Sequence, residues 1–249
     1  MHIHGVDFTS RPSRRKPVTV ASAEHNQIVS LECFPNLDKF EDWLNTSTGV
    51  IGIDAPFGYP VALCSELFLS ERWEDIAKEL SVFGSTDRLY PLAARVEAFR
   101  NVRPSGDKEP KRLTDRASNS ASAMKFFQPP VGRMAARLLP ILHRTSHNVL
   151  PVRPTSSPVT VVEIYPAKWV RANSNGITYK DQLGLRESRR LLLSKTRFSM
   201  RSQLEEEVFA DEKGDLLDAI IACEQVATWI ESGGQMPNDP QILLEGWII

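Results

Sequence analysis

The hydrophobic and polar positions at the start of the chain alternate in short runs that are typical of β-strands. One run closes on Gly-Val-Asp, and another closes on Gly-Ile-Asp followed by Ala-Pro, which ends a strand. Before the second of these runs, a short helical pattern follows Asn36, a typical capping residue. The pattern predicts strands at residues 2–8, 17–23, 27–34 and 49–54, and a helix at residues 37–44.

The middle and the end of the chain show helical periodicity in longer segments. Helices are predicted at residues 71–80, 89–99, 133–142, 185–197 and 215–231, and one further strand at residues 160–164. Residues 101–128 are polar, with prolines and Ser/Asn clusters, so they predict a long loop or insertion. Residues 245–249 are assigned to a last strand or a packing tail.

This order of elements predicts an α/β protein with a mixed β-sheet flanked by helices. A hydrophobic content of 41% with 24% charged residues is sufficient to bury one large core. We therefore expect a single domain over residues 1–249, with a helical and loop insertion at approximately residues 65–158.

The composition argues against several classes of protein. Three scattered cysteines without a CxxC pair are not typical of a disulfide framework or a structural zinc site. The first residues lack a basic leader followed by an apolar run, and charged residues interrupt the most hydrophobic helix candidate, residues 216–230. We therefore expect a cytoplasmic protein outside the membrane. Its tryptophans are assigned to the core or to subunit contacts, which leaves both a monomer and a homodimer open.

Residues 5–7 and 52–54 repeat one pattern, a buried strand that ends on an aspartate, Asp7 or Asp54. A right-handed helical crossover would place the two strands parallel and adjacent, with both carboxylates at one edge of the sheet. That edge is the usual place for a ligand, and two like charges there need a cation or a proton between them. Oxygen ligands favour Mg²⁺ or Mn²⁺. The alternative is that each aspartate simply caps a turn.

Three further acids are candidates for the same site. Asp215 and Asp218 lie at spacing i, i+3 on one face of the helix predicted at residues 215–231. The helix dipole favours acids in a first turn, and this explains Asp215 better than Asp218, which lies next to the apolar face. Glu163 lies within an apolar strand, where an ion needs a partner. A buried salt bridge and a role in a metal site explain Glu163 equally well.

Short motifs along the chain occur in an order that resembles one known family. The motifs are Gly-Val-Asp at residues 5–7, Ile-Asp-Ala-Pro-Phe-Gly at 53–58, Glu-Ile-Tyr-Pro at 163–166, Asp-Leu-Leu-Asp-Ala at 215–219 and Glu-Gly-Trp-Ile at 245–248. Together they resemble an uncharacterised bacterial and archaeal family, domain of unknown function four-two-nine, described as predicted nucleases of RNase H fold. In the middle of the chain, the resemblance rests on Arg-Leu-Thr-Asp-Arg at residues 112–116 and Gly-Arg-Met at 132–134.

The resemblance implies an RNase H-like sheet in which the strands ending at Asp7 and Asp54 are adjacent, with the helix of Asp215 packed across them. In the wider RNase H-like superfamily, acids at these positions bind divalent metal for phosphodiester hydrolysis. Carried over, Asp7, Asp54 and Asp218 are metal ligands, Asp215 assists at the metal and Glu163 assists in catalysis. Asp7 would bridge two ions roughly 3.5–4 Å apart, while Asp54 and Asp218 would each hold one.

A basic stretch favours nucleic acid as the partner. Residues 116–162 contain no Asp or Glu, and their basic side chains are interleaved with Phe126 and Phe127. Such side chains suit a groove for a phosphate backbone with aromatic stacking, and the basic cluster at residues 11–16 fits the same face. The alternative is that these side chains only solvate an exposed surface and pair with acids elsewhere in the chain. The expected nucleic-acid contacts are Arg112, Arg116, Lys125, Arg133 and Arg137.

We therefore expect a divalent-metal-dependent nuclease that hydrolyses DNA or RNA with Mg²⁺ or Mn²⁺. Two other functions stay open. An ATP-dependent phosphotransferase of actin-like or sugar-kinase-like fold shares this strand topology, although such proteins normally need two domains. A non-catalytic nucleic-acid-binding module would keep the fold without turnover. Metal-dependent cleavage of nucleic acid separates the nuclease from the binding module, and ATP-stimulated phosphate transfer identifies the phosphotransferase.

Overall fold

The computed structural model describes residues 1–83, 89–180 and 184–249 of the chain. The chain divides into two compact units. The first unit consists of residues 1–54, 158–235 and 249, and the second consists of residues 55–157 and 236–248. The second unit includes nearly all of the residues predicted as an insertion, approximately residues 65–158. It also contains a segment near the C-terminus that the sequence pattern did not assign to it.

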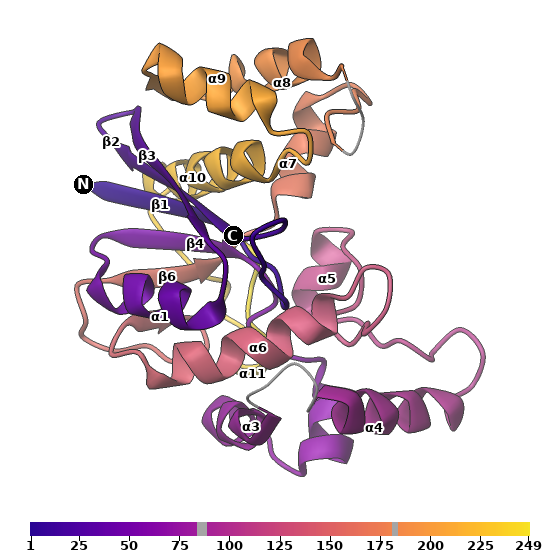
Figure 1. The fold of residues 1–249 in the computed structure, drawn as a ribbon. Helices are drawn as coiled ribbons and strands as arrows, with labels where there is room; N and C mark the ends of the chain where they lie inside the picture. Colours follow the sequence, from indigo (N-terminus) through magenta and orange to yellow (C-terminus); the bar gives the residue numbers. More distant parts are fainter. Residues whose placement is uncertain (84–88, 181–183) are drawn as a thin grey trace. The chain divides into compact units, whose positions relative to one another are not determined.

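The first unit is built on a mixed β-sheet with the strand order β6-β4-β1-β2-β3-β7 (Figure 1). The strands are β1 (His2–Asp7), β2 (Val18–Glu24), β3 (Gln27–Phe34), β4 (Val50–Asp54), β6 (Thr160–Glu163) and β7 (Ser199–Met200). β2 is antiparallel to both β1 and β3, whereas β4 is parallel to both β1 and β6. An antiparallel opening thus continues into a parallel half, and the predicted α/β class with a mixed sheet is confirmed.

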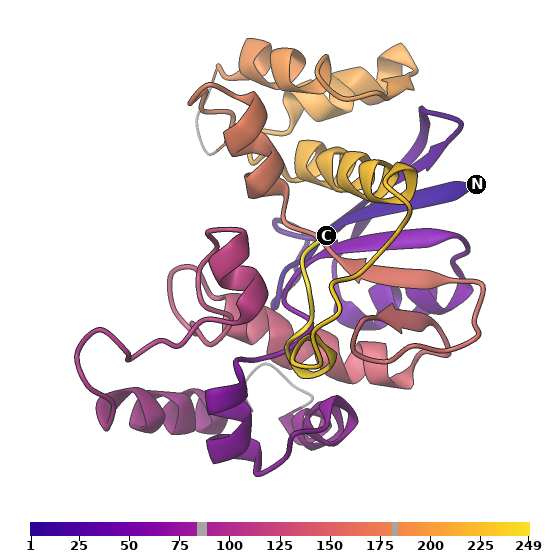
Figure 2. The same cartoon turned by 180° about the vertical axis from the view of Figure 1, so that it is seen from behind.

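Helices pack on both faces of this sheet (Figures 1 and 2). The helices of the first unit are α1 (Leu37–Thr46), α7 (Pro166–Asn173), α8 (Arg186–Leu193), α9 (Ser202–Ala210) and α10 (Asp215–Glu231). Successive residues of a strand point to opposite faces. In β1, the ring of His4 contacts Trp43 of α1 at a centroid distance of 5.5 Å, whereas Gly5 lies against α10. Asp7, two residues after Gly5, therefore faces α10.

Two glycines allow α10 to approach the sheet closely. Gly5 and Gly52 are paired in the parallel register of β1 and β4. A Cβ atom at Gly5 would overlap the backbone of Ala219, and a Cβ atom at Gly52 would lie 2.5 Å from Cγ2 of Val226. The glycine that precedes each aspartate by two residues is thus explained by helix packing, which brings the first turn of α10 to the ends of β1 and β4.

The second unit is mainly helical. Its elements are α2 (Val61–Leu63), the π-helical turn η1 (Cys64–Phe68), α3 (Trp73–Leu80), the 3₁₀ turn η2 (Ser81–Phe83), α4 (Leu89–Asn101), α5 (Leu113–Ala117), α6 (Val131–Arg144), β5 (Asn148–Leu150) and α11 (Ile242–Glu245). The polar atoms of its buried aromatic side chains form hydrogen bonds within the unit. The indole of Trp73 donates to the carbonyl oxygen of Phe57 (2.6 Å), and the hydroxyl of Tyr59 donates to that of Gly132 (2.7 Å).

A buried network of charged groups joins segments of the second unit that are far apart in the sequence. Arg112 donates from Nη2 to Oδ1 of Asp115 and from Nη1 to the carbonyl oxygen of Glu245, both at 2.8 Å. The carboxylate of Glu245 accepts from the backbone N–H groups of Val61 and Leu113, also at 2.8 Å. The motifs that contain Arg112 and Glu245 therefore meet in the interior, where they hold the starts of α2 and α5.

The structure differs from the predicted elements at several places. Helices α7 and α9 were not predicted, and α8 ends at Leu193, four residues before the predicted end at residue 197. The polar segment at residues 101–128 contains the short helix α5. Residues 245–249, predicted as a last strand or a packing tail, form the end of α11 and a tail in which Ile248 is buried, which agrees with the second alternative. Among the described residues, no helix combines the length and the apolar character that a membrane span requires.

Candidate functional site

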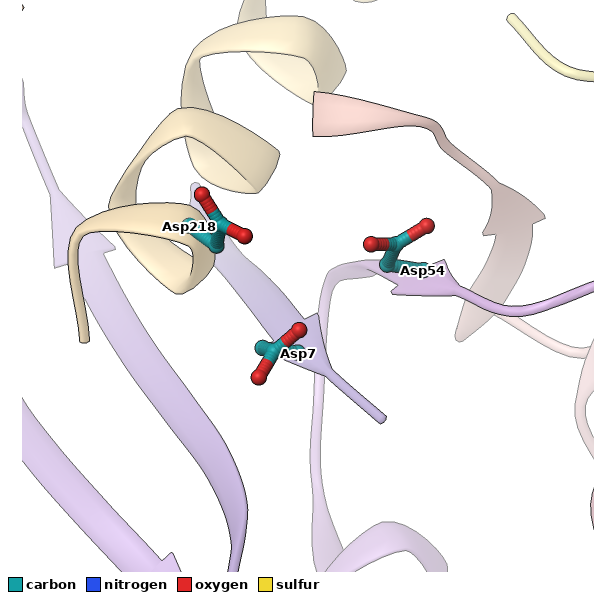
Figure 3. A group of neighbouring side chains, drawn as sticks. All are labelled: Asp7, Asp54 and Asp218. Carbon is teal, nitrogen blue, oxygen red and sulfur yellow. The ribbon is translucent and has the colours of Figure 1, made fainter. Parts of the chain in front are cut away.

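Three carboxylates meet at the ends of β1 and β4. Asp7 and Asp54 are the last residues of these neighbouring parallel strands, and they lie opposite each other in the register. Asp218, in the first turn of α10, lies beside them (Figure 3). One carboxylate oxygen from each of the three residues lies within 4.8 Å of the other two. The repeated strand pattern in the sequence thus corresponds to one shared space with a third carboxylate. We call these three residues the acidic cluster.

A different acid caps the N-terminus of α10. The side chain of Asp211 accepts hydrogen bonds from the backbone N–H groups of Lys213 (3.1 Å) and Leu216 (2.8 Å). Gly214 precedes the helix with a φ of 71°, a left-handed conformation that glycine adopts without strain. Helix capping therefore does not account for Asp218, whose side chain is buried beside Asp7 and Asp54.

Burial raises the pKa values of all three carboxyl groups, and the charge of Asp218 adds to the shifts of Asp7 and Asp54. For Asp7 the loss of solvent is the largest cause, and the negative charge of Asp218 is the next. Burial raises the pKa of Asp54 to about 8, again with Asp218 as the next cause. Burial also raises the pKa of Asp218, although the neighbouring Lys180 opposes this shift. A cation among these groups would favour their ionised forms and would lower the pKa values again.

Two residues that the sequence did not single out, Tyr179 and Lys180, contact the acidic cluster. The hydroxyl of Tyr179 donates to Oδ1 of Asp218 (2.6 Å), and Nζ of Lys180 forms an ion pair with Oδ2 of the same carboxylate. Burial alone would lower the pKa of Lys180, but Asp218 and Asp7 raise it above its ordinary value. Both residues lie in an irregular segment after α7, where no periodicity or motif marks them, so only the fold reveals their position.

Asp215 and Glu163 lie near the acidic cluster but outside it. Asp215 is half-buried in the first turn of α10, and its pKa is raised by burial and then by the charge of Asp211. Glu163 is buried at the end of β6, opposite Ile53 of β4. Its charge adds to the causes that raise the pKa of Asp54. The structure thus brings together three of the five predicted acids and leaves these two as electrostatic neighbours.

Two of the five predicted nucleic-acid contacts are buried. Arg112 is 1% exposed, and its guanidinium is engaged by Asp115 and the carbonyl oxygen of Glu245. Arg137 is 4% exposed on the inward face of α6. Both guanidiniums are buried in this structure, which therefore does not support a phosphate contact by either residue. The sequence pattern does not distinguish an arginine with an internal partner from one on the surface.

The other three predicted contacts are more accessible. Arg116 is exposed and donates to the carbonyl oxygen of Lys111 (2.5 Å). Nζ of Lys125 lies 3.7 Å from Oε2 of Glu109, an acid that precedes the acid-free stretch at residues 116–162. Arg133 is half-buried and stacks over the ring of Phe127, whereas Phe126 is buried. All of these residues belong to the second unit, and their role in binding stays a prediction.

Comparison of the chain with known proteins identifies a family but no individual relative. Neither the curated proteins nor the solved structures contain a match. One family model, described as protein of unknown function (DUF429), matches residues 5–242. That range includes all three residues of the acidic cluster, together with Tyr179 and Lys180. The match spans nearly the whole chain, and the protein therefore belongs to the DUF429 family of proteins of unknown function.

Proposed function

We propose that the acidic cluster binds Mg²⁺ or Mn²⁺ and that the protein hydrolyses phosphodiester bonds in nucleic acid. The observation that carries this proposal is the convergence of Asp7, Asp54 and Asp218 within 4.8 Å at the ends of two adjacent parallel strands. The strand order, with an antiparallel β1–β2–β3 half followed by parallel β4 and β6, and α10 packed across β1 and β4, is compatible with an RNase H-like fold. On an α/β sheet, this edge is the usual place for a ligand.

The donor set fits a hard divalent cation. All three side chains offer carboxylate oxygens, which Mg²⁺ and Mn²⁺ prefer. Burial, and next the charge of Asp218, raises the pKa values of Asp7 and Asp54, so their ionised forms are unfavourable in the folded chain without added positive charge. A divalent cation supplies that charge. Asp7, Asp54 and Asp218 would hold it, while Glu163 and Asp215 add negative potential without belonging to the cluster.

When bound, the cation would supply Lewis acidity and an activated water for hydrolysis. The residues of the chain have separate tasks. Asp7 and Asp54 are fixed by the register of the sheet, so their carboxylates are positioned before any ligand arrives. Tyr179 and Lys180 fix the orientation of the Asp218 carboxylate. The closely packed glycines keep α10 against the strands, so the three oxygens stay together.

A basic loop in the first unit offers binding for the substrate backbone. The loop joins β1, which ends at Asp7, to β2, which begins at Val18. Arg11, Arg14, Arg15 and Lys16 in this loop are all exposed. Because the loop starts directly after a residue of the acidic cluster, its side chains are tethered close to the site. We therefore assign the first phosphate contacts to this loop rather than to Arg112 and Arg137.

The test compares cleavage and metal binding in the parent and in Asp7→Asn. This substitution keeps the shape of the side chain and removes one charge of the cluster. We expect the parent to cleave DNA or RNA oligonucleotides only with Mg²⁺ or Mn²⁺, and to gain thermal stability from either ion by mass action. Asp7→Asn should lose cleavage and most of the metal-induced rise in melting temperature. Without metal, it should be at least as stable as the parent, because one repulsive charge is gone.

Asp42→Asn is the matched control, because Asp42 is exposed on α1. This variant should cleave nucleic acid and respond to metal as the parent does. If the melting temperature of the parent does not respond to either ion, the proposed metal site is contradicted. A parent that binds the ions but cleaves neither DNA nor RNA would leave a metal site without nuclease activity.

A further inference from the structure

Lys180 is held against the acidic cluster by contacts along its whole length. Its Nζ pairs with Oδ2 of Asp218 and lies over the ring of Tyr179, 5.4 Å from the centroid. Its aliphatic stem lies against Gly214. A Cβ atom added to Gly214 would lie only 3.0 Å from Cγ of Lys180. The side chain of Lys180 is 33% exposed, whereas that of Asp218 is only 4% exposed. The ammonium group therefore lies at the boundary between the buried carboxylate and solvent.

The backbone beside Lys180 is also anchored. Arg189, a buried residue of α8, donates from Nε to the carbonyl oxygen of Tyr179 (3.1 Å). The same guanidinium donates to the carbonyl oxygens of Phe209 (3.0 Å) and Glu212 (2.9 Å). One arginine thus ties the segment of Tyr179 to the end of α9 and the start of the connection to α10. This arrangement favours a fixed position for Lys180 over a chance contact of a flexible surface side chain.

The balance of charge limits what the cluster can bind. Three carboxylates face one ammonium, so two negative charges remain when all the acids are ionised. A single divalent cation balances these charges. Two divalent cations would make these four groups positive while Lys180 is in place. The count leaves out Asp215 and Glu163, which lie outside the cluster, and the charge of Lys16 opposes that of Asp215. Tyr179 and Lys180 already contact the two oxygens of Asp218, so fewer of its lone pairs remain for a cation.

We propose that Lys180 is a resident cation of the acidic cluster, which takes the place of a second divalent ion and limits the site to one ion per chain. This inference rests on the proposed function, because it assigns a stoichiometry to the metal site. It replaces the two-ion arrangement that the family resemblance implies. Asp7 and Asp54 are then the principal metal ligands. Asp218 orients Lys180, which supplies a fixed positive charge at the side of the cluster nearest α10.

The test counts bound Mn²⁺ by electron paramagnetic resonance, in which free and bound Mn²⁺ give distinct signals. The parent should bind one ion per chain. Lys180→Met keeps the apolar stem and removes the charge, so it should bind about twice as much Mn²⁺ as the parent at saturation. Lys180→Arg keeps the charge and should match the parent. Lys39→Met, which removes the charge of an exposed lysine on α1, should also match it. A Lys180→Met capacity equal to that of the parent overturns the inference.

A second measurement on the parent avoids any dependence on the folding of a variant. Acetylation of lysines is followed by mass spectrometry with and without Mn²⁺. Lys180 should be modified slowly in both states, because it stays paired with Asp218 when the ion binds. Faster modification of Lys180 in the presence of Mn²⁺ would mean that the ion displaces it, and would overturn the inference. Failure of the proposed function gives a different result. In that case the parent binds no Mn²⁺ at all, while Lys180→Met gains an ion.

Discussion

The carboxyl group of Asp54 holds its proton more tightly in the folded chain than in the unfolded chain. Burial, and next the charge of Asp218, raise its pKa from 3.8 to about 8. Between these two values, the folded chain binds more protons than the unfolded chain does. The free energy of unfolding must therefore fall as the pH rises through this range. Acidic pH should stabilise the metal-free protein at this residue, which is the opposite of the usual effect of a salt-bridged aspartate.

Asp54→Asn should remove this part of the pH dependence. Without metal, we expect the parent to lose on the order of a few kcal/mol of stability between pH 4 and pH 8, because each unit of pKa shift corresponds to about 1.4 kcal/mol. The variant should show a flatter profile and should be the more stable protein at pH 8. Urea unfolding at a series of pH values measures both profiles, with Asp42→Asn as the exposed control. Parallel profiles for the parent and Asp54→Asn would contradict the assignment.

The sequence predicts some of these residues well and others poorly, for physical reasons. Asp7 and Asp54 are predicted because two short strands repeat one pattern, with an aspartate at the end and a glycine two residues before it. The structure explains the pattern, because residues at that spacing share one face of a strand. Lys180 was missed because its partner, Asp218, lies in a distant segment and no local pattern encodes an ion pair between them. Arg112 is predicted to contact nucleic acid because charged side chains are mostly exposed, and the sequence does not show the internal partner that buries this one.

The packing of α10 on the sheet depends on the absence of a side chain at Gly5. Gly5→Ala should destabilise the protein by about 1–3 kcal/mol or more, because the added methyl group would overlap the backbone of Ala219. It should also weaken the Mn²⁺-induced rise in melting temperature, since moving α10 moves Asp218. Gly106→Ala is the control, because nothing lies within 4 Å of that position and only its φ of 92° opposes the change. Equal stability of Gly5→Ala and the parent would disprove the close contact.

The basic loop between β1 and β2 should determine how binding to nucleic acid depends on salt. Replacing Arg14 and Arg15 by alanine should reduce the slope of log K against log salt by roughly 0.7–0.9 for each phosphate contact removed. Fluorescence anisotropy with labelled oligonucleotides at several salt concentrations measures this slope. Arg201→Ala, which removes an exposed charge just before α9, should leave it unchanged. An unchanged slope in the loop variant would mean that the substrate binds elsewhere.

Elements with a strong local signal agree between sequence and structure, and the others do not. The helix predicted at residues 215–231 has the observed bounds of α10, because a long apolar run bounded by Gly214 and Gly233 leaves no alternative. Helix α9 has three consecutive glutamates and buries only Val208 and Phe209, so its amphipathic pattern is short. Helix α7 begins at Pro166, two residues after the end of the strand predicted at residues 160–164, and it has only eight residues.

At the scale of the whole molecule, residues 236–248 belong with residues 55–157 in the second unit. No pattern in the sequence predicts this grouping, because the contacts that fix it join positions far apart in the chain. Glu245 is the central residue. Its carboxylate accepts from the backbone of Val61 and Leu113, and its carbonyl oxygen accepts from Arg112. The two sequence motifs that include Arg112 and Glu245 are therefore explained by a structural network, whereas the motifs of Asp7, Asp54 and Asp218 form the acidic cluster.

This division predicts that Arg112 maintains stability and does not bind nucleic acid. Arg112→Met keeps much of the side-chain volume but leaves the carboxylate of Asp115 buried without its guanidinium partner. A buried pair broken in this way typically costs about 3–5 kcal/mol, and urea unfolding should show a loss of that size. Arg116→Met is a close control, because Arg116 is exposed four residues later, and its stability should change by no more than about 0.5 kcal/mol. If Arg112→Met instead kept the stability of the parent and weakened binding to oligonucleotides, Arg112 would have to reach the surface, and the buried network would be wrong.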